Sequence, residues 1–336
     1  MKHGANIYRY AKQLGCGSDE IIDFSSNINL YQPQTTLHVK SATLTKYADS
    51  SYSRLKSIIA DKYALKKSQI ALYNGATAAI YALLSALKQK KVTLYAPLYG
   101  EYEKAALQSK KDIYKINRIE NLDAPVEKKS IVIFVNPATP EGSFYEIQEL
   151  FSYWKKQKCT VILDESFLAF ENHPSLRTML KSYKKLYIIQ SFSKFYSCAG
   201  VRIGAVFSHK ENIEKLNPPL WNISSLDVKF LQERLNDDSF RQESVALHVT
   251  HKRELQEILK NSQLFEQIVQ SDANFILTCS AQAEKIFTHL LKHKILVRTC
   301  GSFDYLSNNW LRFAVKDSET HTALQNALTT YLGENQ

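Results

Sequence analysis

The sequence predicts an α/β fold in which helices cover both faces of a mostly parallel sheet, followed by a smaller α+β unit. Three observations lead to this prediction. Short apolar runs alternate with helical stretches between residues 53 and 190, and the connections between them are short. The alternation stops after Arg202, where long amphipathic helical stretches begin. Three short strand-like segments then follow towards the C-terminal end.

The elements follow in order along the chain. An N-terminal arm, residues 1–45, is expected to pack on the small domain or the active site, with a short helix over 4–14 and an extended piece over 21–29. A large domain is expected over 46–215, with predicted helices 53–63, 76–87, 101–109 and 147–157 and predicted strands 69–73, 91–96, 130–135, 160–163 and 186–190. A connecting helix over 224–262 and a small domain complete residues 216–336, with strands 273–279, 295–300 and 309–315 and a last helix 317–332.

The composition is ordinary for a globular protein, with 44% hydrophobic and 23% charged residues. No apolar run approaches the roughly 18 residues that a membrane helix needs. The start has no apolar signal region, so we expect a cytoplasmic protein. The net charge of +10 comes from lysine pairs spread along the chain, which favours a solvated surface over nucleic-acid binding. Five dispersed cysteines predict neither a disulfide framework nor a metal site.

Lys194 follows the apolar run 186–190, and a buried ammonium group there is costly unless it is paired or used chemically. Ser191 and Ser193 flank it, and Arg202 follows on the next extended segment. We interpret Lys194 as a lysine that forms a Schiff base with a cofactor aldehyde, while the two serines and the arginine hold the cofactor phosphate. The alternative is a surface lysine in an ordinary serine-rich turn.

Other polar residues also follow predicted strands. Gly75 lies between a strand and a helix, where free backbone N–H groups attract an anion. Asp164 ends a strand, and a buried aspartate is costly unless it meets a cation such as a protonated pyridine nitrogen; a helix cap or a structural ion pair is the alternative. Because the carboxyl ends of parallel strands share one edge, we expect Gly75, Tyr99, Asn136, Asp164 and Lys194 to converge on one pocket.

This set of residues resembles the pyridoxal-phosphate-dependent aminotransferase family of fold type I, in order and spacing, over nearly the whole chain. The resemblance implies a seven-stranded sheet, pyridoxal 5'-phosphate as cofactor and a homodimer with shared active sites. It implies three catalytic residues: Lys194 bonds the cofactor, Asp164 pairs with its ring nitrogen and Tyr99 stacks on its ring. The other residues implied to contact the cofactor are Gly75, Ala76, Thr77, Asn136, Ser191, Ser193 and Arg202, together with Tyr47, which reaches the cofactor of the neighbouring subunit.

The stretches His3-Gly4-Ala5-Asn6-Ile7-Tyr8 and Asp23-Phe24-Ser25-Ser26-Asn27-Ile28-Asn29 are similar to the threonine-phosphate decarboxylase branch of this family, which serves cobalamin biosynthesis. This resemblance implies decarboxylation of L-threonine O-3-phosphate to aminopropanol phosphate and CO2. It also implies that His3, Gly4, Asn27 and Arg298 bind the substrate phosphate and its neighbouring groups. Arg312 matches the arginine that binds the substrate carboxylate, a bidentate task that lysine performs poorly.

Two residues depart from the family pattern. Thr139 replaces the usual asparagine that contacts the 3-oxygen of the cofactor ring, which leaves Asn136 as a substitute, and Phe167 replaces a tyrosine common in the histidinol-phosphate branch. Two alternatives therefore stay open: an aminotransferase of the histidinol-phosphate type, and a catalytically weak protein of the same fold. The sequence does not choose between threonine phosphate and serine phosphate, because one methyl group is worth only about 1–3 kcal/mol in a pocket.

Overall fold

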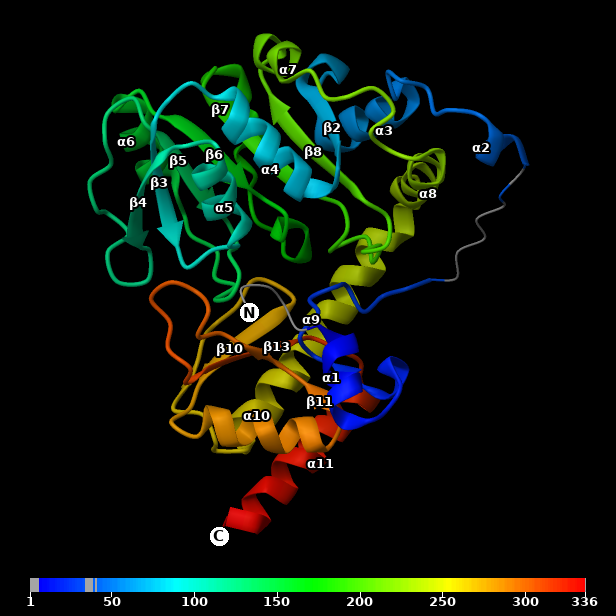
Figure 1. Ribbon diagram of the computed structural model, residues 1–336, viewed down its shortest axis with the longest axis vertical. Coiled ribbons are helices and arrows are strands. Elements are labelled where there is room, and N and C mark those ends of the chain that lie inside the picture. The colour runs from blue at the N-terminus through cyan, green and yellow to red at the C-terminus, as the bar shows by residue number, and fades with distance from the viewer. Residues whose placement is uncertain (1–5, 34–38, 40, 336) are drawn as a thin grey trace.

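A computed structural model of the chain describes residues 6–33, 39 and 41–335. Its central sheet has seven strands in the order β2-β8-β7-β6-β5-β3-β4 (Figure 1). β8 runs antiparallel to both of its neighbours, and all other neighbouring strands are parallel. The strands are β2 (Ile70–Asn74), β3 (Lys91–Ala96), β4 (Asp112–Asn117), β5 (Ile131–Val135), β6 (Thr160–Asp164), β7 (Leu186–Ser191) and β8 (Ile203–Ser208). The mostly parallel sheet predicted from the sequence is confirmed.

Helices cover both faces of this sheet because its strands are apolar on both sides. In β5, for example, Ile131 and Ile133 belong to one hydrophobic cluster and Val132 and Phe134 to the other. The first cluster includes α4 (Gly75–Ala86), α5 (Glu101–Gln108) and α7 (Lys210–Leu216). The second includes α3 (Ser53–Tyr63), α6 (Gln148–Lys156) and α8 (Ser225–Leu235).

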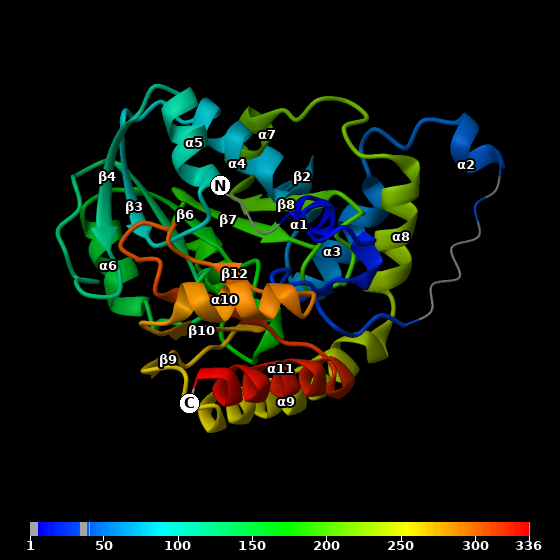
Figure 2. The same cartoon turned by 60° about the horizontal axis from the view of Figure 1, so that its bottom comes forward.

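A second, smaller sheet follows, with the antiparallel order β12-β13-β10-β9. Its strands are β9 (Gln267–Ile268), β10 (Phe275–Cys279), β12 (Arg298–Thr299) and β13 (Trp310–Ala314). The helices of this unit are α9 (Asp238–Asn261), α10 (Ala283–Lys292) and α11 (Ser318–Asn335), and α9 and α11 lie side by side (Figure 2). The predicted helix 224–262 is two helices, because Asp237 begins α9 by accepting a hydrogen bond from the Phe240 N–H.

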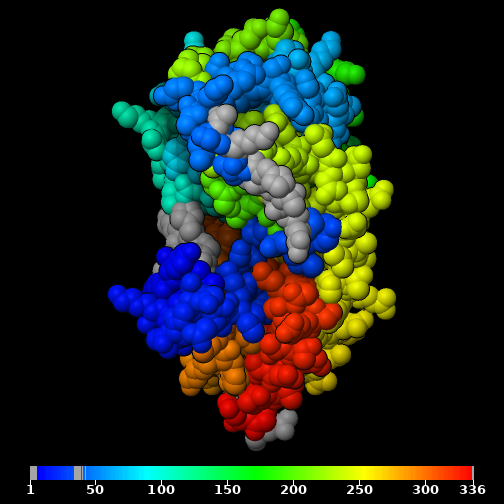
Figure 3. Space-filling view, turned by 90° about the vertical axis from the view of Figure 1, so that its right-hand side faces the viewer, coloured from blue at the N-terminus to red at the C-terminus, as the bar shows by residue number. Residues whose placement is uncertain are grey.

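The N-terminal arm is attached to this smaller unit. α1 (Ile7–Leu14) is capped by the Asn6 side chain and ends at Gly15, whose φ of +67° suits glycine. β1 (Ile22–Asp23) then pairs in parallel with β11 (Ile295–Leu296), so the predicted strand 295–300 is two short strands, β11 and β12, in different sheets. Figure 3 shows the arm in blue beside the orange and red segments of the smaller unit. α2 (Ser41–Thr45) is the last element of the arm. Among the described residues, no helix is both long and apolar enough to cross a membrane.

Candidate active site

A pocket of about 350 Å³ lies where the carboxyl ends of β5, β6 and β7 meet the smaller sheet and the arm. This volume falls in the range of small-molecule sites, about 300–1,000 Å³. Most residues predicted for the site line this one pocket: Asn27, Ala76, Thr77, Tyr99, Asp164, Ser191, Ser193, Lys194, Arg202, Arg298 and Arg312.

The start of α4 forms a cradle suited to a phosphate. Gly75 has a φ of +78°, and a Cβ there would lie 2.7 Å from Nη2 of Arg202. A Cβ on Gly204 would lie 2.4 Å from the backbone nitrogen of Ala76. Both glycines therefore allow a close approach that no larger residue permits. The Nη1 of Arg202 also donates to Ser193 Oγ at 3.4 Å, so free helix N–H groups, a hydroxyl and a guanidinium gather here.

Asp164 is a buried carboxylate, only 6% exposed. Its Oδ2 accepts a 2.7 Å hydrogen bond from the Tyr102 hydroxyl, and its Oδ1 accepts one of 2.9 Å from the Ser166 N–H. Burial raises the pKa of Asp164, although these two hydrogen bonds oppose the shift. No basic side chain among the described residues forms an ion pair with it. A protonated ring nitrogen is the partner that this carboxylate lacks.

Lys194 lies in the loop after β7 and is half-buried. Burial lowers the pKa of its ammonium group to about 8, and the nearby charges of Arg312 and Arg202 add to this shift. The neutral amine, which is the nucleophilic form, is therefore accessible near neutral pH. The backbone carbonyl of Lys194 accepts a 3.0 Å hydrogen bond from the Asn29 N–H, which fastens the arm to this loop.

Arg298 and Arg312 enter the pocket from β12 and β13, where they are partners in the strand register. Both are 5% exposed. Arg312 donates to Thr139 Oγ1 at 2.5 Å and to the Ser25 carbonyl at 2.7 Å, and Arg298 donates to Ser302 Oγ at 2.9 Å. Like charges placed opposite one another destabilise a sheet, so this pair favours bound anions.

Three predicted cofactor residues do not line the pocket: Gly75, which directly precedes the lining residue Ala76, and Asn136 and Tyr47. The Asn136 side chain is held by the Tyr145 backbone, donating to its carbonyl at 2.9 Å and accepting from its N–H at 3.0 Å. Asn136 therefore orders the turn after β5, and the structure does not bring it to the cofactor pocket. Tyr47 is 81% exposed and stacks on Trp221 at 4.7 Å between ring centroids. His3 and Gly4 lie outside the described residues.

The two residues that depart from the family pattern do line the pocket. Thr139 accepts the hydrogen bond from Arg312, so its hydroxyl is committed to positioning that arginine. Phe167 packs edge-on against Phe275 at 5.2 Å between ring centroids and offers no hydrogen-bonding group. Thr77 lies at this end as well, with its hydroxyl 3.3 Å from that of Tyr99.

Sequence reasoning missed several residues of the site. Tyr102 holds Asp164 from α5, and the Ser166 hydroxyl accepts a 3.0 Å hydrogen bond from the Ser191 N–H. Ser166 and Phe303 also line the pocket, as does Ser25 in the predicted extended piece 21–29. The position of Ser166, two residues past a strand end, is a usable signal. Nothing in the sequence pattern singles out Tyr102 or Phe303.

The family described as "Aminotransferase class I and II" matches residues 19–329 of the chain. The chain belongs to this family. The members are pyridoxal-phosphate-dependent enzymes, so the predicted family, fold and cofactor are confirmed. The residues present fit this cofactor, because the site combines a phosphate cradle, a buried carboxylate without a cation and an amine with a lowered pKa.

Three curated relatives of the aminotransferase family are similar to this chain. The adenosylcobalamin biosynthesis bifunctional protein of Leptospira interrogans is 30% identical over 98% of this chain, which spans 41% of that longer protein. The threonine-phosphate decarboxylase of Salmonella typhimurium is 26% identical, covering 97% of this chain and 96% of its own. The histidinol-phosphate aminotransferase of Parabacteroides distasonis is 27% identical, covering 84% and 86%.

Solved structures agree with the fold. The histidinol-phosphate aminotransferase of Clostridium acetobutylicum superposes with a TM-score of 0.81 at 27% identity, covering 93% of this chain and 99% of that one. The histidinol-phosphate aminotransferase of Sinorhizobium meliloti, solved in complex with pyridoxal-5'-phosphate, has a TM-score of 0.82 at 17% identity and covers 99% and 95%.

Proposed function

We propose that the protein decarboxylates a phosphorylated amino acid, and that this substrate is L-threonine O-3-phosphate. The buried pair Arg298 and Arg312 carries the proposal, because two cations in one pocket suit a substrate with two anionic groups. Threonine phosphate has a carboxylate and a phosphate, whereas histidinol phosphate has a phosphate and no carboxylate. The name of the Salmonella relative supports the same interpretation, and the name of the Leptospira relative supports only a place in adenosylcobalamin biosynthesis.

Lys194 would hold the cofactor through its aldehyde group and would move a proton at the substrate Cα. Asp164, held by Tyr102, would pair with the ring nitrogen of the cofactor, and Tyr99 would contact its ring. When bound, the cofactor supplies an electron-withdrawing ring that takes up the electron pair of the bond broken at Cα. The residues that hold its phosphate in this proposal are Gly75, Ala76, Thr77, Ser191, Ser193 and Arg202.

The substrate anchors decide which bond breaks. Arg312 binds the carboxylate, while Arg298 and Asn27, with His3 and Gly4 from the arm, bind the phosphate. Fixing both ends sets the rotation about Cα, so binding energy remote from the reacting carbon selects the bond between Cα and the carboxylate. The carboxylate leaves as CO2, and the electron pair of the broken bond stays with Cα. A proton is then added at Cα, which gives aminopropanol phosphate.

The second candidate is an aminotransferase of the histidinol-phosphate type, which the Parabacteroides relative favours. An amino donor with two carboxylates would also suit Arg298 and Arg312. The two activities separate in one experiment, in which threonine phosphate, serine phosphate and histidinol phosphate are each incubated with and without 2-oxoglutarate. CO2 release from threonine phosphate without 2-oxoglutarate supports the proposal, and amino transfer that requires 2-oxoglutarate refutes it. Lys194→Ala is the inactive control for both.

The arm and the domain division are part of this proposal. Residues 1–45 act as an arm that completes the site, as supported by the hydrogen bonds of Asn29 to the Lys194 carbonyl and of Arg312 to the Ser25 carbonyl. Residues 46–215 form the cofactor-binding domain, and residues 216–336 form the connecting helices and the small domain. The five unpaired cysteines suit a reducing compartment, and we place the protein in the cytoplasm.

The protein acts as a homodimer in this proposal, and Tyr47 reaches the cofactor of the partner subunit. The support is an exposed apolar patch formed by Leu44, Tyr47, Leu220 and Trp221. Trp221→Asp is expected to shift the protein from dimer to monomer in size-exclusion chromatography with light scattering. Val249→Asp, at a comparably exposed site on α9, is the control that leaves the dimer intact.

A further inference from the structure

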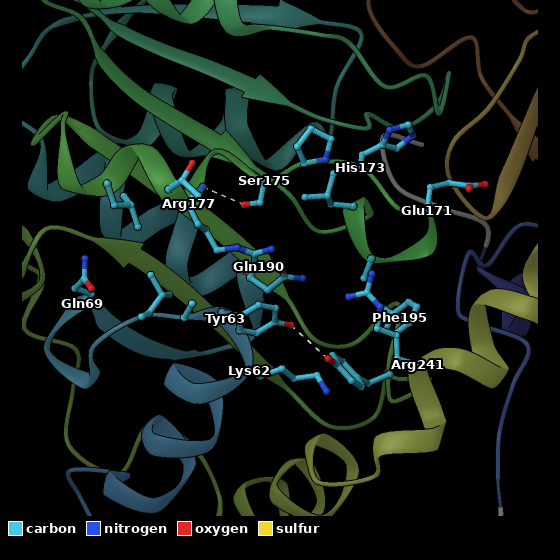
Figure 4. A pocket seen from close by; sticks show the side chains of 18 of the residues that line it. Lys62, Tyr63, Gln69, Glu171, His173, Ser175, Arg177, Gln190, Phe195 and Arg241 are labelled. Atoms are coloured by element: carbon cyan, nitrogen blue, oxygen red, sulfur yellow. Dashed lines mark hydrogen bonds between the residues drawn. The ribbon is translucent and has the colours of Figure 1, made fainter.

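A second pocket, of about 620 Å³, lies behind the loop that carries Lys194. It is formed by the end of α3, two short 3₁₀ turns (Leu168–Phe170 and Leu176–Lys181) and the start of α9 (Figure 4). Phe195 and Tyr196, which directly follow Lys194, line this second pocket, whereas Lys194 lines the first. The proposed reaction uses no residue of the second pocket.

The lining of the second pocket carries an excess of positive charge. Among the described residues that line it, Glu171 is the only acidic one. Burial opposes the ionisation of Glu171, but contacts with His248 and Lys252 outweigh burial and lower its pKa to about 2. Its negative charge is thus already balanced by residues outside the lining. The basic side chains of the lining are Lys62, Arg177, Lys181 and Arg241.

Among the described residues, the Arg177 guanidinium has one long ion pair and one nitrogen without a hydrogen-bond partner. Its Nη1 is buried without a hydrogen-bond partner in the described part of the chain. The nearest carboxylate oxygen, Glu165 Oε2, is 3.8 Å from Nη2, and it already accepts a 2.6 Å hydrogen bond from Ser175 Oγ. A guanidinium has five N–H donors, and leaving such groups buried and unpaired is costly. The Arg177 side chain lines the pocket and is 16% exposed, so acceptor atoms in the pocket meet the accessible part of this side chain.

Aromatic rings stand beside these charges. The Arg177 guanidinium lies over the ring of Tyr63, 4.4 Å from its centroid. The Tyr63 hydroxyl is 3.4 Å from that of Tyr196, whose ring packs edge-on against Phe195. Figure 4 shows Arg177 and Tyr63 on one side of the pocket and Phe195 and Arg241 on the other. An apolar group that packs on Tyr63 would place an attached anion beside Arg177.

We propose that the second pocket binds a small organic anion, whose phosphate or carboxylate group contacts Arg177 and whose apolar part packs on Tyr63. Arg241, exposed at the rim, contributes a weaker attraction. Phosphate and carboxylate share the planar two-oxygen edge that a guanidinium recognises. The site is separate from the phosphate cradle at α4 and from the pair Arg298 and Arg312.

The test is isothermal titration calorimetry on the cofactor-loaded protein with phenyl phosphate, benzoate and benzyl alcohol as probes. Arg177→Met is expected to weaken binding of the preferred anion roughly 10- to 100-fold, the range for a lost charge-assisted hydrogen bond. Arg241→Gln is expected to weaken it roughly 2- to 5-fold. Arg253→Gln, a largely exposed arginine on α9, and Arg298→Gln, in the first pocket, are expected to leave it unchanged.

The three probes separate the possible outcomes. Tighter binding of phenyl phosphate supports the proposal with a phosphate ligand, and tighter binding of benzoate supports it with a carboxylate ligand. Equal binding of benzyl alcohol overturns it, because the charge would then be irrelevant. A loss caused by Arg298→Gln and not by Arg177→Met also overturns it, as does the absence of binding at millimolar probe. If Arg177→Met fails to fold, the double variant with Lys181→Gln and Arg241→Gln is used instead. Its affinity for the preferred anion is expected to be lower than that of the wild type.

Discussion

Arg298 and Arg312 are register partners across two antiparallel strands, and both side chains are buried in the same pocket. Their side chains share one face of the sheet, where two like charges repel each other. Burial lowers the pKa of Arg312 to about 10, with Arg298 contributing, so both remain charged at neutral pH. A pocket built this way is stabilised by a ligand that carries two negative groups.

Removing Arg298 should therefore affect the phosphate end of the substrate selectively. For Arg298→Gln we expect the ratio of kcat/KM for threonine phosphate to that for threonine to fall roughly 10- to 100-fold, since a charge-assisted contact to one group is lost. Steady-state kinetics with both substrates measures this ratio, with Arg253→Gln as the exposed control. An equal decrease of kcat/KM for both substrates would show that Arg298 does not contact the substrate phosphate.

The Tyr102 hydroxyl should matter for cofactor affinity. Its 2.7 Å hydrogen bond stabilises the ionised form of Asp164, and Tyr102→Phe raises the pKa of Asp164 further. We expect cofactor affinity to fall roughly 5- to 50-fold, in line with about 1–2 kcal/mol for an unmet partner in a buried site. Absorbance titration of the apoprotein measures this. Tyr73→Phe is the matched control, because the Tyr73 hydroxyl is buried without a partner in the described residues. If Tyr102→Phe and Tyr73→Phe lose cofactor affinity to a similar extent, the hydrogen bond from Tyr102 to Asp164 has no specific role in cofactor binding.

The lowered pKa of Lys194 has a consequence for stability. Its pKa is about 8 in the folded protein, against 10.5 for an ordinary lysine, so the unfolded chain binds more protons between these pH values. Lys194 therefore destabilises the apoprotein below pH 10.5, most strongly below about pH 8. We expect apo Lys194→Met to melt at a higher temperature than the apo wild type at about pH 7. This gap should close as the pH rises from about 8 towards 10.5, and thermal unfolding across that window tests it. A wild type that is more stable than the variant at neutral pH would contradict the assignment.

Gly204 should be indispensable for the phosphate cradle, whereas Gly200 should not. A Cβ at Gly204 meets the backbone of Gly75 and Ala76 at 2.4–2.7 Å, while one at Gly200 meets nothing within 4 Å. We expect Gly204→Ala to lower the free energy of unfolding by about 1–3 kcal/mol, as overpacking does, and to weaken cofactor binding. Gly200→Ala is the control. Denaturant unfolding and cofactor titration measure both effects, and equal behaviour of the two variants would count against the cradle.

The large sheet is predictable where strands are buried and apolar on both faces. β5 and β7 are such strands, and the predicted bounds agree with the structure within one residue. β4 escapes prediction because it lies at the edge of the sheet, where Asp112 and Tyr114 are exposed and polar side chains interrupt the apolar run. The direction of β8 depends on the fold of the connection after Lys194, which periodicity does not report.

Site residues are predictable where a reactive or charged side chain directly follows a strand. They are less predictable where tertiary packing brings a side chain to the site. Lys194 and Asp164 stand at positions of the first kind, and both line the pocket. Tyr102 lies 62 residues before Asp164 on a helix, and only tertiary packing brings the two together. Asn136 also follows a strand, but both the nitrogen and the oxygen of its side-chain amide form hydrogen bonds with the backbone of Tyr145. Strand ends thus predict which residues reach the edge of the sheet but not which partner each side chain finds there.

The most direct test of the proposed reaction follows two atoms of one substrate. L-threonine O-3-phosphate labelled with ¹³C in the carboxylate and ¹⁵N in the amino group is incubated with the enzyme and 2-oxoglutarate, and the products are followed by NMR. If the enzyme decarboxylates this substrate, ¹³C appears as CO2 or bicarbonate and ¹⁵N stays in aminopropanol phosphate. Transfer of ¹⁵N to glutamate, with ¹³C kept in a phosphorylated keto acid, would contradict the proposed reaction.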